Sequence, residues 1–173
     1  MDKSKSNQMK LTCALFAVYL LALVWIVLFK FQFSFDTMPH FRGLNLIPFA
    51  GSVVKGNRLD YNEIILNLIV FIPFGLYLSM VKPNWLFWKR VVLIAGVSLI
   101  FELLQYIFAI GGTDITDLMS NTLGGVVGVG LYAIIFKILK EKTNKVLNIV
   151  TLVGTIGIVI LGIVVSRFIT FRF

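Results

Sequence analysis

The sequence has little charge, a single cysteine and a single histidine. Only 14% of its 173 residues are charged, whereas 58% are hydrophobic, and the mean hydropathy is +0.93. A chain of this composition has too little polar surface to enclose a soluble core. One cysteine, Cys13, excludes an intrachain disulfide, and neither a histidine pair nor a nucleotide-binding glycine loop occurs. We therefore predict an integral membrane protein whose first partner is the lipid bilayer.

The charge that is present is mostly basic. Sixteen Lys and Arg residues against eight Asp and Glu residues give a net charge of +8. In a membrane protein such an excess indicates contact with anionic lipid headgroups and carries information about topology. The basic residues are scattered between apolar runs and form no stripe, so the pattern argues against a nucleic-acid partner.

Five apolar runs are long enough to span about 30 Å of hydrocarbon at ~1.5 Å per residue. They cover residues 11–29, 62–81, 87–110, 116–137 and 146–166. The sequence thus predicts an all-α membrane protein, a five-helix transmembrane bundle that forms one domain over residues 1–173. If the N-terminus is cytoplasmic, ten of the sixteen Lys and Arg residues lie in cytoplasmic segments. The positive-inside rule therefore favours a cytoplasmic N-terminus and an exterior C-terminus.

Two segments at the predicted exterior face alternate in side-chain character. Phe31–Phe35 follows the first apolar run, and Ile169–Phe173 follows the last. A period of two residues is typical of a half-buried strand. Two interpretations stay open: the segments pair as a short two-stranded exterior β element, or both are interfacial belts of aromatic residues.

Polar side chains interrupt the second, third and fourth apolar runs. Asp114, Asp117 and Asn121 are spaced i, i+3, i+7, which places them on one helix face. The helical rise puts the polar groups of all three runs roughly 8–12 Å below the exterior surface. Because lone polar groups facing lipid are unfavourable, we predict that the three helices enclose one exterior-opening cavity. Its predicted lining is Asn67, Glu102, Gln105, Asp117 and Asn121, with Asp114 beside it.

A structural interpretation competes with this one. Thr113 or Asp114 can cap the N-terminus of a helix, and a helix dipole favours a carboxylate at Asp117. Gln105 and Asn121 can serve as interhelical hydrogen-bonding residues. Glu102 fits the structural interpretation least well, because no Lys or Arg in the second to fourth runs could pair with its carboxyl group.

Small residues form a stripe in the fourth run. Ser120, Gly124 and Gly128 recur every four residues and therefore share one helix face. Such a stripe allows the backbones of two membrane helices to approach closely. We predict a packing role for it and assign it no chemistry.

Four motifs follow one another in a defined order. They are Asn45-Leu46-Ile47-Pro48-Phe49; Asn67 followed by Phe71-Ile72-Pro73-Phe74-Gly75; Glu102-Leu103-Leu104-Gln105; and Gly112-Thr113-Asp114-Ile115-Thr116-Asp117 with Asn121-Thr122-Leu123-Gly124-Gly125. Their order and spacing resemble the VanZ-like membrane protein family. The resemblance adds Asn45 to the candidate binding residues. It implies a multi-pass protein of the bacterial plasma membrane in Gram-positive cells, linked to lowered susceptibility to teicoplanin-type lipoglycopeptides.

The residues and the resemblance together leave two main functions. In the first, a non-enzymatic pocket binds a lipoglycopeptide antibiotic or a lipid-linked cell-wall precursor and limits access of the antibiotic. In the second, an intramembrane enzyme acts on a lipid-linked cell-envelope substrate, with Glu102, Asp114 and Asp117 holding a divalent cation or exchanging protons. Carboxylates without histidine or cysteine suit Mg²⁺, Mn²⁺ or Ca²⁺ rather than zinc. A proton relay is disfavoured, because the interior halves of these runs offer no polar path.

Overall fold

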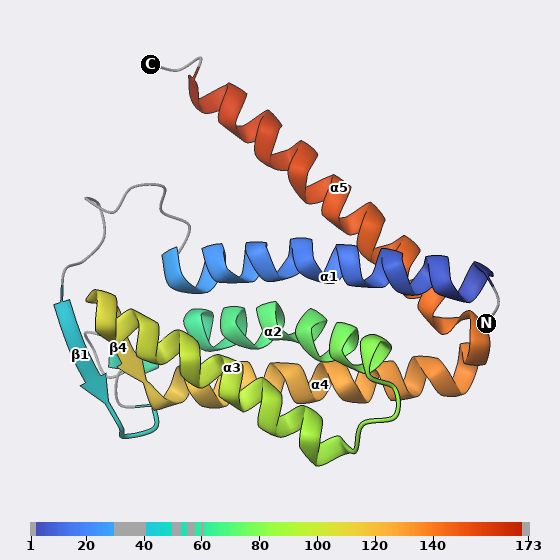
Figure 1. Ribbon diagram of the computed structural model, residues 1–173. Helices are drawn as coiled ribbons and strands as arrows, with labels where there is room; N and C mark the ends of the chain where they lie inside the picture. Colours follow the sequence, from blue (N-terminus) through green and yellow to red (C-terminus); the bar gives the residue numbers. More distant parts are fainter. Residues whose placement is uncertain (1–2, 30–40, 50–52, 55–57, 60, 171–173) are drawn as a thin grey trace.

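Long helices account for most of the chain in the computed structural model (Figure 1). The structure describes residues 3–29, 41–49, 53–54, 58–59 and 61–170. Its helices are α1 (Lys3–Phe29), α2 (Tyr61–Val81), α3 (Phe87–Phe108), α4 (Ile115–Leu139) and α5 (Thr143–Thr170). A short 3₁₀ turn, η2 (Lys140–Lys142), joins α4 directly to α5.

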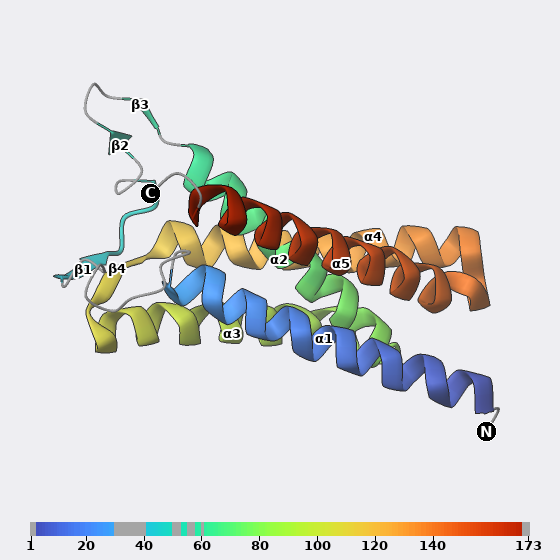
Figure 2. The ribbon, with the colours of Figure 1, turned by 90° about the horizontal axis from the view of Figure 1, so that it is seen from above.

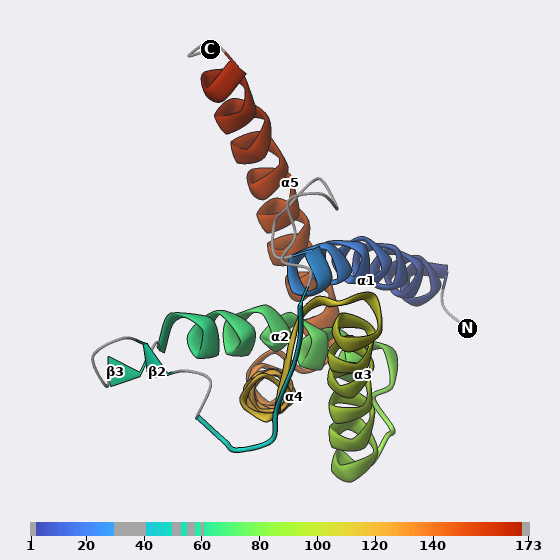
Figure 3. The same ribbon diagram turned by 90° about the vertical axis from the view of Figure 1, so that its left-hand side faces the viewer.

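The core lies where α1, α2, α3 and α4 meet. Helix α4 packs against both α2 and α3, and α1 packs against α2 and α3, as the end-on view shows (Figure 3). Buried apolar side chains from all four helices fill this centre: Leu23, Phe71, Phe74, Ile94 and Val129. The outer faces carry many exposed large apolar side chains instead. That inversion of the usual soluble pattern is what a lipid environment requires.

Four helical stretches in the described residues are long and apolar enough to cross a membrane. They are Lys5–Leu28, Tyr61–Val81, Phe87–Phe108 and Ile115–Ile156. This supports a multi-pass membrane protein, but the predicted count of five spans is not confirmed. One stretch of 42 residues, Ile115–Ile156, contains the predicted span 116–137 and the first part of the predicted span 146–166, because η2 joins α4 to α5 without a loop. The chain reverses direction at η2 (Figures 1 and 2), so a separate crossing by α5 stays a prediction.

The β structure consists of two short strand pairs. Strand β1 (Phe41–Asn45) pairs in parallel with β4 (Ile110–Asp114), and β2 (Val53–Val54) pairs antiparallel with β3 (Arg58–Leu59). The register of the parallel pair places Gly43 opposite Gly112 and Asn45 opposite Asp114. It lies at the end of the bundle where α3 ends and α4 begins (Figure 1). A β element is therefore present, but it does not use the predicted strands.

The predicted pairing of Phe31–Phe35 with Ile169–Phe173 is wrong at the C-terminal strand. Ile169 and Thr170 form the end of α5. No glycine or proline follows Gly162 to stop this helix, so the apolar helix continues through the alternating residues. The remaining residues of the predicted pair, 31–35 and 171–173, lie outside the described part of the chain.

Glycines on α2 and α4 bring the two backbones into contact. A Cβ atom added to Gly124 would overlap the carbonyl oxygen of Leu68, and one added to Gly128 would overlap that of Ile72. A Cβ at Gly75 would likewise overlap the carbonyl oxygen of Gly125. The predicted small-residue stripe is thus confirmed as the surface on which α2 packs.

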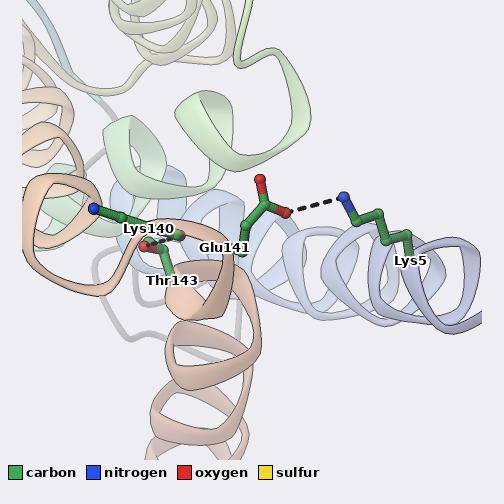
Figure 4. Close-up of polar contacts among 4 residues, drawn as sticks. All are labelled: Lys5, Lys140, Glu141 and Thr143. Atoms are coloured by element: carbon green, nitrogen blue, oxygen red, sulfur yellow. Dashed lines mark hydrogen bonds and ion pairs between the residues drawn. The ribbon is translucent and has the colours of Figure 1, made fainter.

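Polar contacts attach the start of α5 to α1. The fully buried Asn148 is hydrogen-bonded to Thr12 (Oγ1 to Oδ1, 3.0 Å) and donates through Nδ2 to the backbone and side-chain oxygens of Gln8 (3.2 Å each). Figure 4 shows a second link, the ion pair between Lys5 and Glu141 (3.0 Å). Both side chains of this pair are exposed, so it contributes little, and the Asn148 contacts hold this junction.

We expect Gly128→Ala to destabilise the bundle, because the added methyl group must push α2 away from α4. Overpacking of this kind costs about 1–3 kcal/mol. Gly130→Ala on the same helix is the matched control, since no heavy atom of the described neighbouring residues lies within 4 Å of its Cβ position. The control should be neutral or up to about 1 kcal/mol more stable, because alanine favours a helix. Unfolding in detergent measures both, and equal stability of the two variants would contradict this contact.

Candidate binding cavity

The site is built at the connection between α3 and α4. Helix α3 is followed by its C-cap residue Ala109, whose backbone adopts the left-handed conformation (φ 56°). The Ala109 N–H donates to the carbonyl oxygens of Gln105 and Tyr106. The chain then runs directly through β4 into α4, with no intervening loop. Side chains near the end of α3 and the start of α4 are therefore held close together.

Asp114 caps α4, as the structural interpretation predicted. Its Oδ1 accepts a hydrogen bond from the backbone N–H of Thr116 (2.7 Å), and its Oδ2 accepts one from Nδ2 of Asn45 (3.0 Å). The Asn45 segment makes a second contact, because the backbone N–H of Phe49 donates to Oγ1 of Thr116 (2.9 Å). Asn45 also accepts from the N–H of Ile47 (3.2 Å). The first motif is thus hydrogen-bonded to the start of α4 at two positions.

Glu102 fixes the other side of this connection. Its carboxyl oxygen Oε2 accepts a hydrogen bond from the backbone N–H of Asp114 (2.9 Å). Its backbone oxygen accepts from Oγ1 of Thr113 (2.9 Å). The side chain is only 2% exposed. Glu102 is therefore a structural anchor for β4 as well as a candidate site residue.

A cavity of about 100 Å³ lies between α1, α2, α3 and α4. Its lining comprises Ile26, Val27, Glu63, Leu66, Asn67, Glu102, Gln105, Asp117 and Asn121. All five residues predicted to share a cavity line this one. Asn45 and Asp114 do not line it and instead shape the structure beside it. The wall supplied by α1 was missed, because Ile26 and Val27 resemble every other apolar residue of their helix.

Two cavity-lining residues each have a buried amide oxygen with no hydrogen-bond partner among the described residues. Gln105 donates through Nε2 to the backbone oxygen of Val27 (2.9 Å), which leaves its Oε1 unpaired. Asn121 donates through Nδ2 to Oγ of Ser98 (3.1 Å), which leaves its Oδ1 unpaired. The two side chains are only 2% and 1% exposed. Because an unsatisfied buried acceptor costs about 1–3 kcal/mol, both oxygens favour a ligand that donates hydrogen bonds.

The three carboxylates proposed as metal ligands do not form a metal-binding group. Within the described residues, no cluster of three or more His, Cys, Asp or Glu side chains could hold a metal ion. Asp114 is engaged with Asn45 and Thr116, and it does not line the cavity with Glu102 and Asp117. The residues present therefore do not fit a divalent cation held by Glu102, Asp114 and Asp117.

We expect Asn45→Ala to loosen the start of α4, because it removes the hydrogen bond to the Asp114 carboxylate. The loss should be about 1.5–3 kcal/mol of unfolding free energy, the range for a hydrogen bond to a charged group. Amide hydrogen exchange should also accelerate at Thr116. Ile47→Ala in the same segment is the matched control, since its side chain is exposed. Equal effects of the two variants would show that Asn45 does not hold α4.

Comparison with known proteins agrees with the motifs. The family model described as VanZ/LLP1 matches residues 16–137, which include all four motifs. The chain is also 40% identical over 153 residues to "Protein VanZ" of Enterococcus faecium, a match that covers 87% of this chain and 90% of that protein. No solved structure matches the chain. The extent of both sequence matches shows that this protein belongs to the VanZ/LLP1 family.

Proposed function

We propose that this protein lowers the susceptibility of Gram-positive cells to teicoplanin-type lipoglycopeptides. The proposal assigns this effect to the cavity, which would bind part of the antibiotic or of a lipid-linked cell-wall precursor and so limit access of the antibiotic. Family membership and the VanZ relative support the class of function. The unpaired oxygens of Gln105 and Asn121 are the observation that supports the cavity as its site.

The size of the cavity limits how such a ligand could bind. Pockets that enclose a drug-sized molecule measure roughly 300–1,000 Å³. A cavity of about 100 Å³ can take only a small polar group of a larger ligand. The remainder of the ligand would lie outside the cavity. Leu66 marks the side on which it would lie, because this residue lines the cavity and is also 42% exposed. Exposed Ile65 and Ile69 extend this apolar surface along α2, which suits a ligand that carries a lipid chain.

A second candidate function is an intramembrane enzyme that acts on a lipid-linked cell-envelope substrate. The observation that favours it is that Glu102 and Asp117 line the same small cavity. Two carboxyl groups around one substrate group can serve as general acid and general base without a metal ion. This candidate differs from the first only in that the bound ligand would be chemically changed.

We expect Glu102→Gln and Asp117→Asn each to restore teicoplanin susceptibility to that of cells without the protein. Both substitutions keep side-chain shape and remove a charge at the cavity. The measurement is the teicoplanin inhibitory concentration in a susceptible Gram-positive host, with membrane abundance determined in parallel. Glu141→Gln is the charge-matched control and should keep full resistance, because Glu141 is exposed in η2, beyond the end of α4 that is remote from Asp117.

The outcome of these assays separates the alternatives. Full resistance in both cavity variants at wild-type abundance would reject the cavity as the site. If resistance is lost, the purified wild-type protein is incubated with a lipid-linked cell-wall precursor. The molecular mass of the precursor is then measured by mass spectrometry. An unchanged mass supports binding alone, whereas a new product that Glu102→Gln fails to form supports the enzyme.

A further inference from the structure

We infer that the cavity takes up a primary ammonium group, carried either by a membrane lipid or by a soluble amine. The inference rests on the proposed function, since it names the chemical group that the same cavity binds. It follows from three properties of the described cavity: the polarity of its lining, the orientation of its amides and the character of its walls.

The polar lining is rich in acceptors and acidic. Glu63, Glu102 and Asp117 contribute carboxyl groups, and Gln105 and Asn121 contribute amide oxygens without partners. The described residues that line the cavity include no Lys, Arg or His. Within the described residues the lining thus offers acidic groups and hydrogen-bond acceptors but no cationic side chain, which favours a cation with N–H donors over an anionic group.

The amide orientations leave oxygens available. The backbone oxygen of Val27 can only accept a hydrogen bond, so Gln105 must direct its NH₂ group there and its Oε1 elsewhere. Asn121 uses its own NH₂ group on Ser98. A ligand at this point must donate, and a primary ammonium offers three donors where a hydroxyl offers one. A quaternary ammonium has the charge but no donor.

The apolar walls suit an alkyl stem behind the nitrogen. Ile26, Val27 and Leu66 line the same cavity as the acceptors. Amines bury their methylene groups along apolar surface while the charged nitrogen reaches polar partners. A volume of about 100 Å³ matches a compact headgroup of this kind better than a whole antibiotic.

Calorimetry on the full-length protein in phosphatidylcholine nanodiscs tests the inference. The probes are hexylammonium, hexan-1-ol, which lacks the charge, and hexyltrimethylammonium, which lacks the donors. We expect hexylammonium to bind at least about tenfold more tightly than either control, the factor for losing one charge-assisted hydrogen bond. Equal affinity for hexan-1-ol or hexyltrimethylammonium would overturn the inference, as would binding of Mg²⁺ without binding of hexylammonium.

Paired variants assign the binding to the unpaired oxygen. Asn121→Leu removes both Oδ1 and the bond to Ser98, whereas Ser98→Ala removes that bond and keeps Oδ1. We expect hexylammonium affinity to fall about tenfold or more in Asn121→Leu and to stay within about twofold in Ser98→Ala. Should Asn121→Leu fail to fold, Gln105→Met replaces it, because this substitution removes the other unpaired amide oxygen, Oε1 of Gln105. Unchanged affinity in the folded variant would overturn the inference.

A further arm separates the two sources of the group. Nanodiscs containing phosphatidylethanolamine should weaken hexylammonium binding by competition if the natural group is a lipid headgroup, and leave it unchanged if it is a soluble amine. Failure of this inference also differs from failure of the proposed function. Loss of resistance in Glu102→Gln without any hexylammonium binding overturns the inference alone. Hexylammonium binding that is lost in Glu102→Gln while resistance persists overturns the proposed function alone.

Discussion

The arrangement of the site depends on one hydrogen bond, from the backbone N–H of Asp114 to the carboxyl group of Glu102 (2.9 Å). It joins the end of α3 to the residue that caps α4, and the same residue receives the Asn45 side chain from β1. A carboxyl group that anchors a strand is positioned more rigidly than one on a free helix face. Glu102 can therefore face a cavity without being free to swing out of it, and three of the four sequence motifs meet at this point.

Buried amides that are only half satisfied usually weaken a protein. Gln105 and Asn121 each use their donors within the bundle and leave an acceptor unpaired. Replacing both partners of such a bond by apolar groups of the same shape can be nearly neutral, so packing alone does not require these amides. Strained or unsatisfied groups of this kind are expected where function rather than stability determines the residue. The cavity concentrates two of them beside carboxyl groups.

The local features of the sequence predicted the structure well. Apolar run lengths located α1 to α4, and the small-residue stripe predicted the packing face of α4. The spacing of Asp117 and Asn121 correctly placed both at one cavity, but Asp114 belongs to β4 and does not share their helix face. Non-local features were not predictable in the same way. The pairing of β1 with β4 joins short segments far apart in the chain, and nothing in their local pattern distinguishes the partner. The alternating residues before the C-terminus wrongly predicted a strand, because a helix can also contain such a short alternation. The contribution of α1 to the cavity was not predicted, because Ile26 and Val27 are apolar like their neighbours.

The parallel pairing of β1 and β4 has a consequence for how the protein is made. Strand β1 is synthesised before α2, but its partner emerges only after α3 is complete. Contacts between distant segments form late, because the chain between them must be placed first. During synthesis the nascent chain therefore holds β1 with an open edge until the α2–α3 hairpin has been inserted. The cavity takes its lining from α1 to α4, so it cannot be complete before α4 has been placed, and it needs α2 and α3 to be positioned first.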